Sequence, residues 1–287
     1  MTATITSATV AGARIELLRQ GSGRPILFLH PHIGVERALP FIERLSGAGE
    51  VLAPSHPGFG ESERPAGVTS IDDISYVYLQ LLQQLDLRDV LVVGSSLGAW
   101  IALAMAVKST ERVSQLVLAD AVGVKFGARD QLDFADIYAI PEKKFIELAY
   151  HDRSFAQRDY MTMSDAELVV VARNNESTAR YAWSPYMYDP RLRHLLYRIA
   201  VPTLILWGAG DRFASVDYGR HYAGAISGAT FMEIANAGHF PHIEQPEATT
   251  AAIVAFARRH TAAGQHKGIT EQGAFAPCIS PISEGKF

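Results

Sequence analysis

Short apolar runs alternate with segments of helical periodicity along most of the chain. Each run is four to seven residues long, and most are rich in Val, Ile and Leu, which is typical of strands buried on both faces of a sheet. The runs cover residues 26–29, 50–54, 90–93, 113–119, 202–207 and 229–234. Because helical segments separate them, the chain predicts an α/β fold with a parallel sheet and helices on both faces.

Weaker patterns extend this alternation. Residues 4–19 alternate between apolar and polar side chains and predict one or two antiparallel strands that open the sheet. Residues 71–85 have apolar side chains at helical spacing behind Ser70 and Asp72, which are typical helix-capping residues. A last helix is expected over residues 246–260.

The alternation stops after Asp120. The next 80 or so residues are richer in charged and aromatic side chains and contain no clear strand, although two segments, 141–150 and 164–174, have helical patterns. The predicted organisation is therefore a core of residues 1–121 and 199–260, a helical insertion of residues 122–198, and a poorly ordered tail of residues 261–287, which has few bulky apolar groups.

Composition narrows the choice of partners. Apolar residues make up 48% and charged residues 20%, which is ordinary for a soluble globular protein. A net charge of −4 without clustered basic runs argues against a nucleic-acid partner, and no apolar run reaches the roughly 18 to 20 residues of a membrane span. The single cysteine, Cys278, cannot form an internal disulfide, and the N-terminus lacks the features of a secretion signal. We therefore expect a cytoplasmic protein.

The strongest local signal is VLVVGSSLGAWIALA, residues 90–104. Its β-branched first half predicts a buried strand, and its Ala- and Leu-rich second half predicts a helix. A turn from strand directly into helix has little room for side chains, so Gly94 and Gly98 let the backbone bend and hold Ser96 at the edge of the sheet. Ser96 is therefore the candidate nucleophile.

This G-x-S-x-G turn resembles the nucleophile elbow of the α/β-hydrolase family. Asp211 in WGAGDRF matches the family's acid position, and His239 in NAGHFPHIEQPE matches its histidine; the order Ser, Asp, His is also that of the family. The resemblance implies a mostly parallel eight-stranded sheet flanked by helices. It also implies that the insertion is a helical cap placed after strand six, which would cover the nucleophile and shape the substrate pocket.

The three residues have complementary chemistry. A serine hydroxyl needs a base to take its proton and a carboxylate to orient that base, and the resemblance assigns these roles to His239 and Asp211. Asp120 follows strand six, where some members of the family place the acid. It stays open as an alternative to Asp211, with anchoring of the cap hinge as its other role.

The family's oxyanion donors map onto two backbone N–H groups, those of His32 and of Leu97, the residue after the nucleophile. The chain departs from the family's usual His-Gly sequence by carrying Pro31, which has no N–H. Among the aromatic residues, Trp183 and Tyr186 of the cap and Phe240 beside the histidine are the candidate substrate contacts.

The resemblance implies a hydrolase of small molecules that needs no metal and no cofactor. A serine at the elbow disfavours haloalkane dehalogenases and epoxide hydrolases, which carry an aspartate there. Carbon-carbon bond hydrolases acting on ring-cleavage dienone acids use serine, but they usually carry Asn and Trp where this chain has Ser95 and Phe240.

We therefore expect cleavage of a carboxylic ester or lactone through an acyl-enzyme intermediate. A carbon-carbon bond hydrolase is the main alternative. A slow-turnover sensor of a small ligand is the alternative of another class, and the sequence leaves the oligomeric state open.

Overall fold

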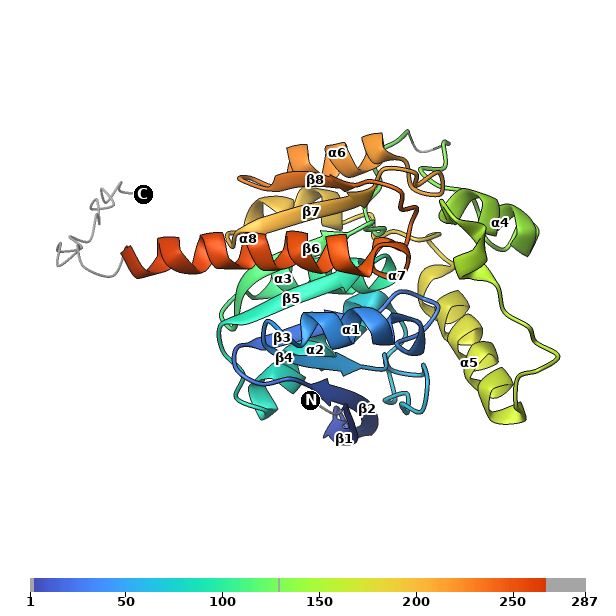
Figure 1. The fold of residues 1–287 in the computed structure, drawn as a ribbon, viewed down its shortest axis with the longest axis horizontal. Coiled ribbons are helices and arrows are strands. Elements are labelled where there is room, and N and C mark those ends of the chain that lie inside the picture. Colours follow the sequence, from blue (N-terminus) through green and yellow to red (C-terminus); the bar gives the residue numbers. More distant parts are fainter. Residues whose placement is uncertain (1–2, 129, 267–287) are drawn as a thin grey trace, which may run out of the picture.

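The computed structural model describes residues 3–128 and 130–266. Its strands form one sheet in the order β1-β2-β4-β3-β5-β6-β7-β8 (Figure 1). β2 pairs antiparallel with β1 and β4, and all other neighbours are parallel. The strands are β1 (Thr4–Val10), β2 (Ala13–Gln20), β3 (Pro25–Leu29), β4 (Glu50–Pro54), β5 (Val90–Ser95), β6 (Val113–Ala119), β7 (Thr203–Gly208) and β8 (Thr230–Ile234). The predicted eight-stranded, mostly parallel sheet is confirmed.

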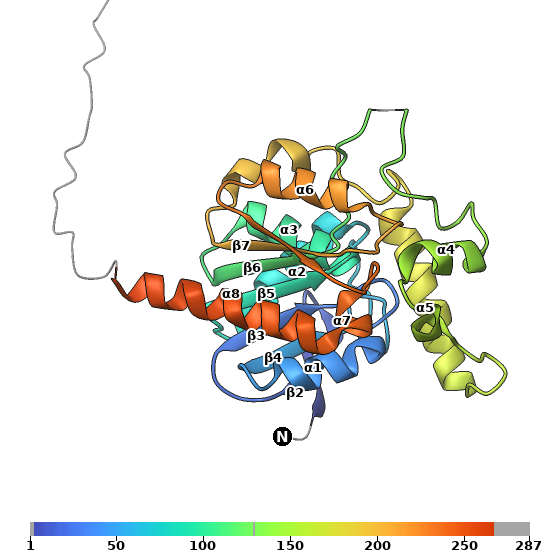
Figure 2. The same cartoon turned by 45° about the horizontal axis from the view of Figure 1, so that its top comes forward.

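Helices cover both faces of the sheet. α1 and α8 lie on one face, and α2, α3 and α6 lie on the other (Figures 1 and 2). The α-helices are α1 (Leu39–Leu45), α2 (Ile71–Gln84), α3 (Leu97–Lys108), α4 (Glu142–Ala149), α5 (Asp165–Ala182), α6 (Val216–Ala225), α7 (Pro241–Glu244) and α8 (Pro246–His266). The short 3₁₀ helices are η1 (Glu36–Ala38), η2 (Arg153–Ala156), η3 (Leu192–His194) and η4 (Leu196–Arg198).

Each central strand contributes side chains to two hydrophobic cores, one on each face of the sheet, which explains its continuous apolar sequence. In β5, Val90 and Val92 belong to the core beneath α2 and α3, while Leu91 and Val93 belong to the core beneath α1 and α8. Successive side chains of a strand point to opposite faces, so a strand covered on both sides needs apolar residues throughout. Burial of these side chains stabilises the sheet by about 1.5–3 kcal/mol for each large one.

Several helix ends differ from the sequence predictions. α5 continues to Ala182, eight residues past the predicted end, because polar side chains in its second half bond to the core rather than to water. Ser177 Oγ donates to Gly58 O at 2.8 Å and Tyr181 OH donates to Pro57 O at 3.0 Å. α8 continues to His266, and the predicted tail from residue 267 onward, with Cys278, lies outside the described residues.

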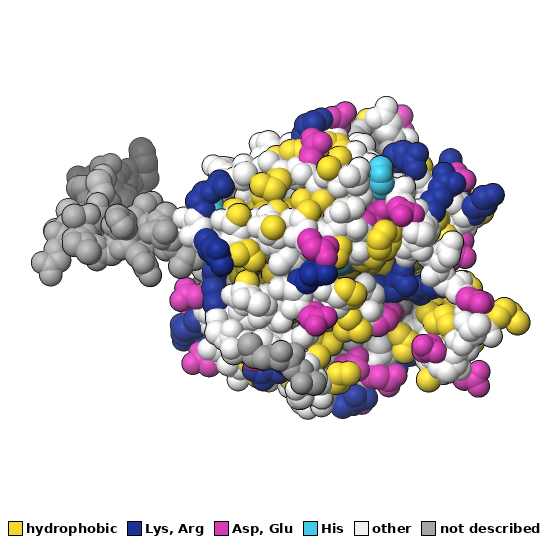
Figure 3. All heavy atoms as spheres, viewed as in Figure 1, with side chains coloured by type: hydrophobic (Ala, Val, Ile, Leu, Met, Phe, Trp, Pro, Cys, Tyr) yellow, Lys and Arg dark blue, Asp and Glu magenta, His cyan; other side chains and the backbone are white. Residues whose placement is uncertain are grey.

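The segment between β6 and β7 contains α4 and α5 and no strand among its described residues. In Figures 1 and 2 both helices lie beyond the end of the sheet where β5, β6 and β7 finish. This is the end at which loops of a parallel sheet gather functional groups. Within the described residues, no helix has the length and hydropathy needed to cross a membrane. On the face shown in Figure 3, acidic and basic side chains are interspersed.

Gly98 generates a stability prediction. A Cβ on Gly98 would lie 2.0 Å from Leu29 O, so Gly98→Ala forces α3 away from β3 and is expected to cost about 3 kcal/mol of unfolding free energy. Gly224 in α6 is the matched control, because a Cβ there meets nothing within 4 Å and Gly224→Ala should stabilise by about 0.5–1 kcal/mol. Urea denaturation measures both changes, and equal effects of the two substitutions would contradict this account.

Candidate active site

Ser96 stands at the turn between β5 and α3 with its backbone at φ 52° and ψ −113°. Positive φ is costly for a residue with a Cβ, and two hydrogen bonds hold it: Ser96 N–H donates to Ala119 O, and Trp100 N–H donates to Ser96 O. The turn is tight because a Cβ on Gly94 would lie 2.5 Å from Gly98 O. The two predicted glycines are thus required where Ser96 is held.

His239 and Asp211 approach Ser96 from two other loops. His239 Nε2 lies 2.8 Å from Ser96 Oγ, and His239 Nδ1 lies 2.7 Å from Asp211 Oδ2. A carboxylate only accepts, so Nδ1 donates to Asp211 and Nε2 is left to accept the Ser96 hydroxyl proton. All three side chains are buried, with at most 4% of the residue exposed, so their interactions are little screened by water.

Backbone groups fix the acid and the histidine. Asp211 Oδ1 accepts from the N–H groups of Phe213 and Ala214 at 2.8 and 3.1 Å, which leaves Oδ2 aimed at the imidazole. His239 N–H donates to Ala149 O at the end of α4. The rings of Phe213 and Phe240 pack edge-on against the imidazole, with centroids 4.8 and 5.0 Å away. These contacts hold the imidazole in place.

Asp120 lies beside this chain of hydrogen bonds but does not replace Asp211 in it. One ligand atom each from Asp120, Asp211 and His239 lie within 4.8 Å of one another. Such a cluster resembles a metal site, yet the His239 and Asp211 groups are hydrogen-bonded to each other, which accounts for the arrangement. Asp120 Oδ1 accepts from Gly208 N–H at 2.8 Å. Of the two predicted acids, Asp211 contacts the histidine.

The loop after β3 lies against the start of α3. A Cβ on Gly98 would also lie 2.6 Å from His30 O, so the missing side chain lets this loop approach the nucleophile turn. The backbone N–H groups of His32 and Leu97 have no hydrogen-bond partner within the described part of the chain. Leu97 is the first residue of α3, and unpaired N–H groups that point to one place favour a negatively charged oxygen there.

His30 has a structural partner that sequence reasoning missed. Its ring stacks on that of His56 with centroids 3.7 Å apart, His56 Nε2–H donates to His30 O, and His56 N–H donates to His30 Nε2. Tyr78 OH completes the network at His56 Nδ1, 2.5 Å away. The sequence around His56, residues 55–58, gives no periodic signal for this pairing. His30 and Tyr78 are 26 and 22 residues away from His56 along the chain.

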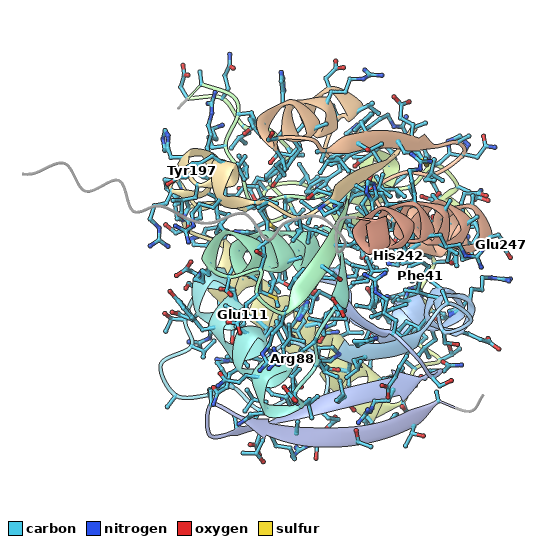
Figure 4. The ribbon with its side chains drawn as sticks, turned by 90° about the vertical axis from the view of Figure 1, so that its left-hand side faces the viewer. Phe41, Arg88, Glu111, Tyr197, His242 and Glu247 are labelled. Atoms are coloured by element: carbon cyan, nitrogen blue, oxygen red, sulfur yellow. The ribbon has the colours of Figure 1, made fainter. Side chains whose placement is uncertain are left out.

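Two neighbouring histidines are held neutral by burial. Burial lowers the pKa of His32 to about 3, with a further contribution from the nearby His239 and Arg158. Burial also lowers the pKa of His242 to about 3. Figure 4 shows His242 of α7 beside Phe41 of α1, their ring centroids 5.7 Å apart. His242 therefore packs among the core side chains of this face.

A cavity of about 440 Å³ lies between the core and the inserted segment and reaches the site at His32. Its wall is mostly apolar and aromatic, but Arg158 also lines it and donates from Nη2 to Ile33 O at 3.3 Å. A second cavity of about 600 Å³ adjoins it, and Arg158 and Val171 line both. Arg158 escaped sequence reasoning because residues 151–163 have no periodicity that sets the direction of a side chain.

The three predicted substrate contacts lie behind the cavity wall. Trp183 is 55% exposed and packs on Tyr138, with centroids 5.0 Å apart. Tyr186 OH accepts from Ile137 N–H and donates to Ala135 O. Phe240 is completely buried. None of the three is among the residues that line the 440 Å³ cavity, so their contact with a substrate stays a prediction.

The chain belongs to the alpha/beta hydrolase family, whose model matches residues 26–253. It is 30% identical over 253 residues to a 2-hydroxymuconate semialdehyde hydrolase of Pseudomonas putida, covering 83% of this chain and 88% of the relative. It is 26% identical over 253 residues to a putative non-heme bromoperoxidase of Mycobacterium tuberculosis, covering 82% and 94%. The protein is therefore a hydrolase-family member, as the resemblance implied.

Solved structures share the fold at lower identity. A variant of the meta-cleavage product hydrolase CumD has a TM-score of 0.72 and 22% identity, with 88% of this chain and 98% of that chain covered. A thermophilic esterase from Thermogutta terrifontis has a TM-score of 0.68 and 24% identity, with 90% and 99% covered. Both show that this architecture is that of the α/β hydrolases.

The buried histidines predict acid sensitivity of the fold. An unfolded histidine binds a proton below about pH 6.5, whereas His30, His32 and His242 stay neutral in the fold until about pH 4, 3 and 3. The unfolded state therefore binds more protons between these values, and the unfolding free energy falls as the pH drops from about 6.5 toward 4.

The contribution of one histidine can be isolated. His242→Phe removes a buried nitrogen, Nε2, that has no hydrogen-bond partner. Between about pH 6.5 and 4 the substitution should reduce the slope of the unfolding free energy against pH by about 1.4 kcal/mol per pH unit. His194→Gln, at an exposed position, should leave the slope unchanged. Denaturation at a series of pH values measures the slopes, and equal slopes in wild type and His242→Phe would contradict the assignment.

Proposed function

We propose that the protein is a serine hydrolase that cleaves a carboxylic ester or lactone of a small molecule through an acyl-enzyme intermediate. The observation that carries this proposal is the buried hydrogen-bond chain from Ser96 Oγ through His239 to Asp211 Oδ2. Such a chain provides a nucleophile, a base to take its proton, and an anion that stabilises the protonated base.

The proposed reaction has two halves. Ser96 Oγ attacks the carbonyl carbon while its proton passes to His239 Nε2, and the carbonyl oxygen becomes an anion. His239 then gives that proton to the leaving oxygen as its bond to carbon breaks. A water molecule repeats the sequence on the acyl-enzyme, its proton passing to Nε2 and its oxygen to carbon. Release of the acid returns the proton to Ser96.

The N–H groups of His32 and Leu97 are the proposed oxyanion donors. Their position at the contact between the loop after β3 and the start of α3, and their lack of a partner in the described residues, support this role. Each donor of this kind contributes about 2.7–4 kcal/mol to the transition state. Because the N–H groups of His32 and Leu97 supply both hydrogen bonds, the missing N–H of Pro31 removes neither proposed donor.

We propose that residues 122–198 form a cap over the site. Support comes from the bond between Ala149 O and His239 N–H and from the position of α4 and α5 in Figure 1. A cap keeps water from the acyl-enzyme except where the cavity admits it. The 440 Å³ cavity has room for a small molecule. A cytoplasmic location stays a prediction from the sequence.

Carbon-carbon bond hydrolysis is the second candidate function. The similarity to the 2-hydroxymuconate semialdehyde hydrolase of Pseudomonas putida favours it. So does a 28% identical relative named as a 2-hydroxy-6-oxo-2,4-heptadienoate hydrolase, and the substrate in that name carries a carboxylate. Arg158 on the cavity wall would pair with such a group. Ser95 and Phe240, where these enzymes usually carry Asn and Trp, favour the ester. Rates on short aryl esters and on a dienone acid separate the two.

Ser96→Ala tests the nucleophile. It should lower kcat by about 10⁶ with the fold intact, because no other hydroxyl is hydrogen-bonded to His239 Nε2 in the described residues. Ser95→Ala is the matched control one residue earlier, a buried serine that contacts His242 instead, and should keep its activity. Ester hydrolysis retained by Ser96→Ala would refute the proposal, and wild-type rates no faster than buffer would favour a ligand sensor.

Arg158→Gln tests the choice of substrate. Loss of a charge-assisted hydrogen bond costs about 1.5–3 kcal/mol, so kcat/KM for a carboxylate-bearing substrate should fall about 10- to 150-fold, while that for a neutral ester stays within a factor of about three. Arg153→Gln, in which an exposed arginine beside Glu147 is replaced, should change neither. Equal losses on both substrates would argue against recognition of a carboxylate by Arg158.

A further inference from the structure

Asp120 is a completely buried carboxyl group with one oxygen left over. It follows β6 in a left-handed conformation, φ 45°, and its N–H donates to Leu206 O. Its Oδ1 accepts from Gly208 N–H, but its Oδ2 is buried and has no hydrogen-bond partner. A buried carboxylate oxygen without a donor is costly, so the group needs an explanation.

The proposed catalytic acid is a charged neighbour of Asp120. One carboxyl oxygen of Asp120, one of Asp211 and one ring nitrogen of His239 lie within 4.8 Å of one another. Glu244 also faces this region, but its two oxygens accept from Gly238 and Asp152 N–H groups. No cation other than a protonated His239 is placed to neutralise two adjacent carboxylates among the described residues.

Two ionised carboxylates cannot share such a site, because the repulsion is unscreened and neither charge is hydrated. The hydrogen bonds decide which one keeps the charge. Asp211 accepts three, from Phe213 N–H, Ala214 N–H and His239 Nδ1–H, whereas Asp120 accepts one. Donors stabilise the ionised form. Asp211 is therefore the anion, and the proton belongs on Asp120 Oδ2.

We propose that Asp120 is a positioning residue: a neutral carboxylic acid whose Oδ2 proton is directed at the Asp211 carboxylate, so that the pair carries one negative charge. The inference rests on the proposed function and refines it, since the effect of the Asp211 carboxylate on His239 then depends on a hydrogen bond from Asp120. Burial, followed by the charge of Asp211, raises the pKa of Asp120 well above its ordinary value, in agreement with this geometry.

Infrared spectroscopy tests the proton directly. At pH 7 the difference spectrum between wild type and Asp120→Asn should show loss of a protonated carboxyl band. Asp189→Asn is the control. Burial raises the pKa of Asp189, but the hydrogen bonds and charge of Arg191 outweigh burial and lower it overall, so this substitution should remove an ionised carboxylate band. Loss of only an ionised band in Asp120→Asn would overturn the proposal.

The pH dependence of kcat/KM tests the positioning role. Asn replaces a neutral acid by a neutral amide that can still accept from Gly208 and donate toward Asp211, so the acidic midpoint should stay within about 0.3 pH units. Asp120→Ala removes the donor and should raise the midpoint by about 1 pH unit, a shift that Asn reverses. A lowered midpoint in Asp120→Asn, or an unmoved one in Asp120→Ala, would overturn the proposal.

The two experiments separate this inference from the proposed function. The infrared result needs no turnover and is decisive even if Asp120→Ala fails to fold. Activity retained by Ser96→Ala would refute the serine mechanism while the infrared spectrum still reported where the proton lies. An ionised Asp120 in an enzyme that depends on Ser96 would refute only the role proposed for Asp120.

Discussion

The site depends on the absence of a side chain at Gly98. A Cβ there would lie 2.0 Å from Leu29 O, so only glycine lets the first turn of α3 rest on the end of β3. That contact brings the loop containing His32 to the nucleophile turn. It also fixes the start of the helix whose first residue follows Ser96, and therefore helps hold Ser96 in its strained conformation. The positions of the proposed nucleophile and of the proposed oxyanion donors therefore depend on the same close contact.

The same loops that carry the acid and the histidine also hold the inserted segment. Ala149 O accepts from His239 N–H, and Leu148 O accepts from Arg212 N–H beside the acid. Glu244 extends this connection, because one of its oxygens binds the histidine loop and the other binds Asp152. The end of α4 is therefore hydrogen-bonded directly to the loops that carry the acid and the histidine.

Burial also determines the charge of the site. The neighbouring histidines are neutral because an imidazolium without water is unfavourable, and the aromatic rings of Phe213 and Phe240 exclude water from the imidazole of His239. In such surroundings an anion at Asp211 would act strongly on His239, the proposed base. A site with few charges, each held by several hydrogen bonds, suits a reaction in which one proton moves between Ser96 and His239.

The sequence alone predicted the sheet, the strand-to-helix turn at Ser96, and Asp211 and His239 as the partners proposed for Ser96, because strand periodicity, glycine spacing and motif order can be seen in the sequence itself. It also predicted α4, but it ended α5 too early, since polar residues such as Ser177 read as exposed until their core partners are known. The bond of His239 to Asp211 rather than Asp120, the pairing of His30 with His56, and the position of Arg158 depend on residues distant in sequence. Only the tertiary structure decides these, because burial and charge at one position are set by whatever side chains the fold brings beside it.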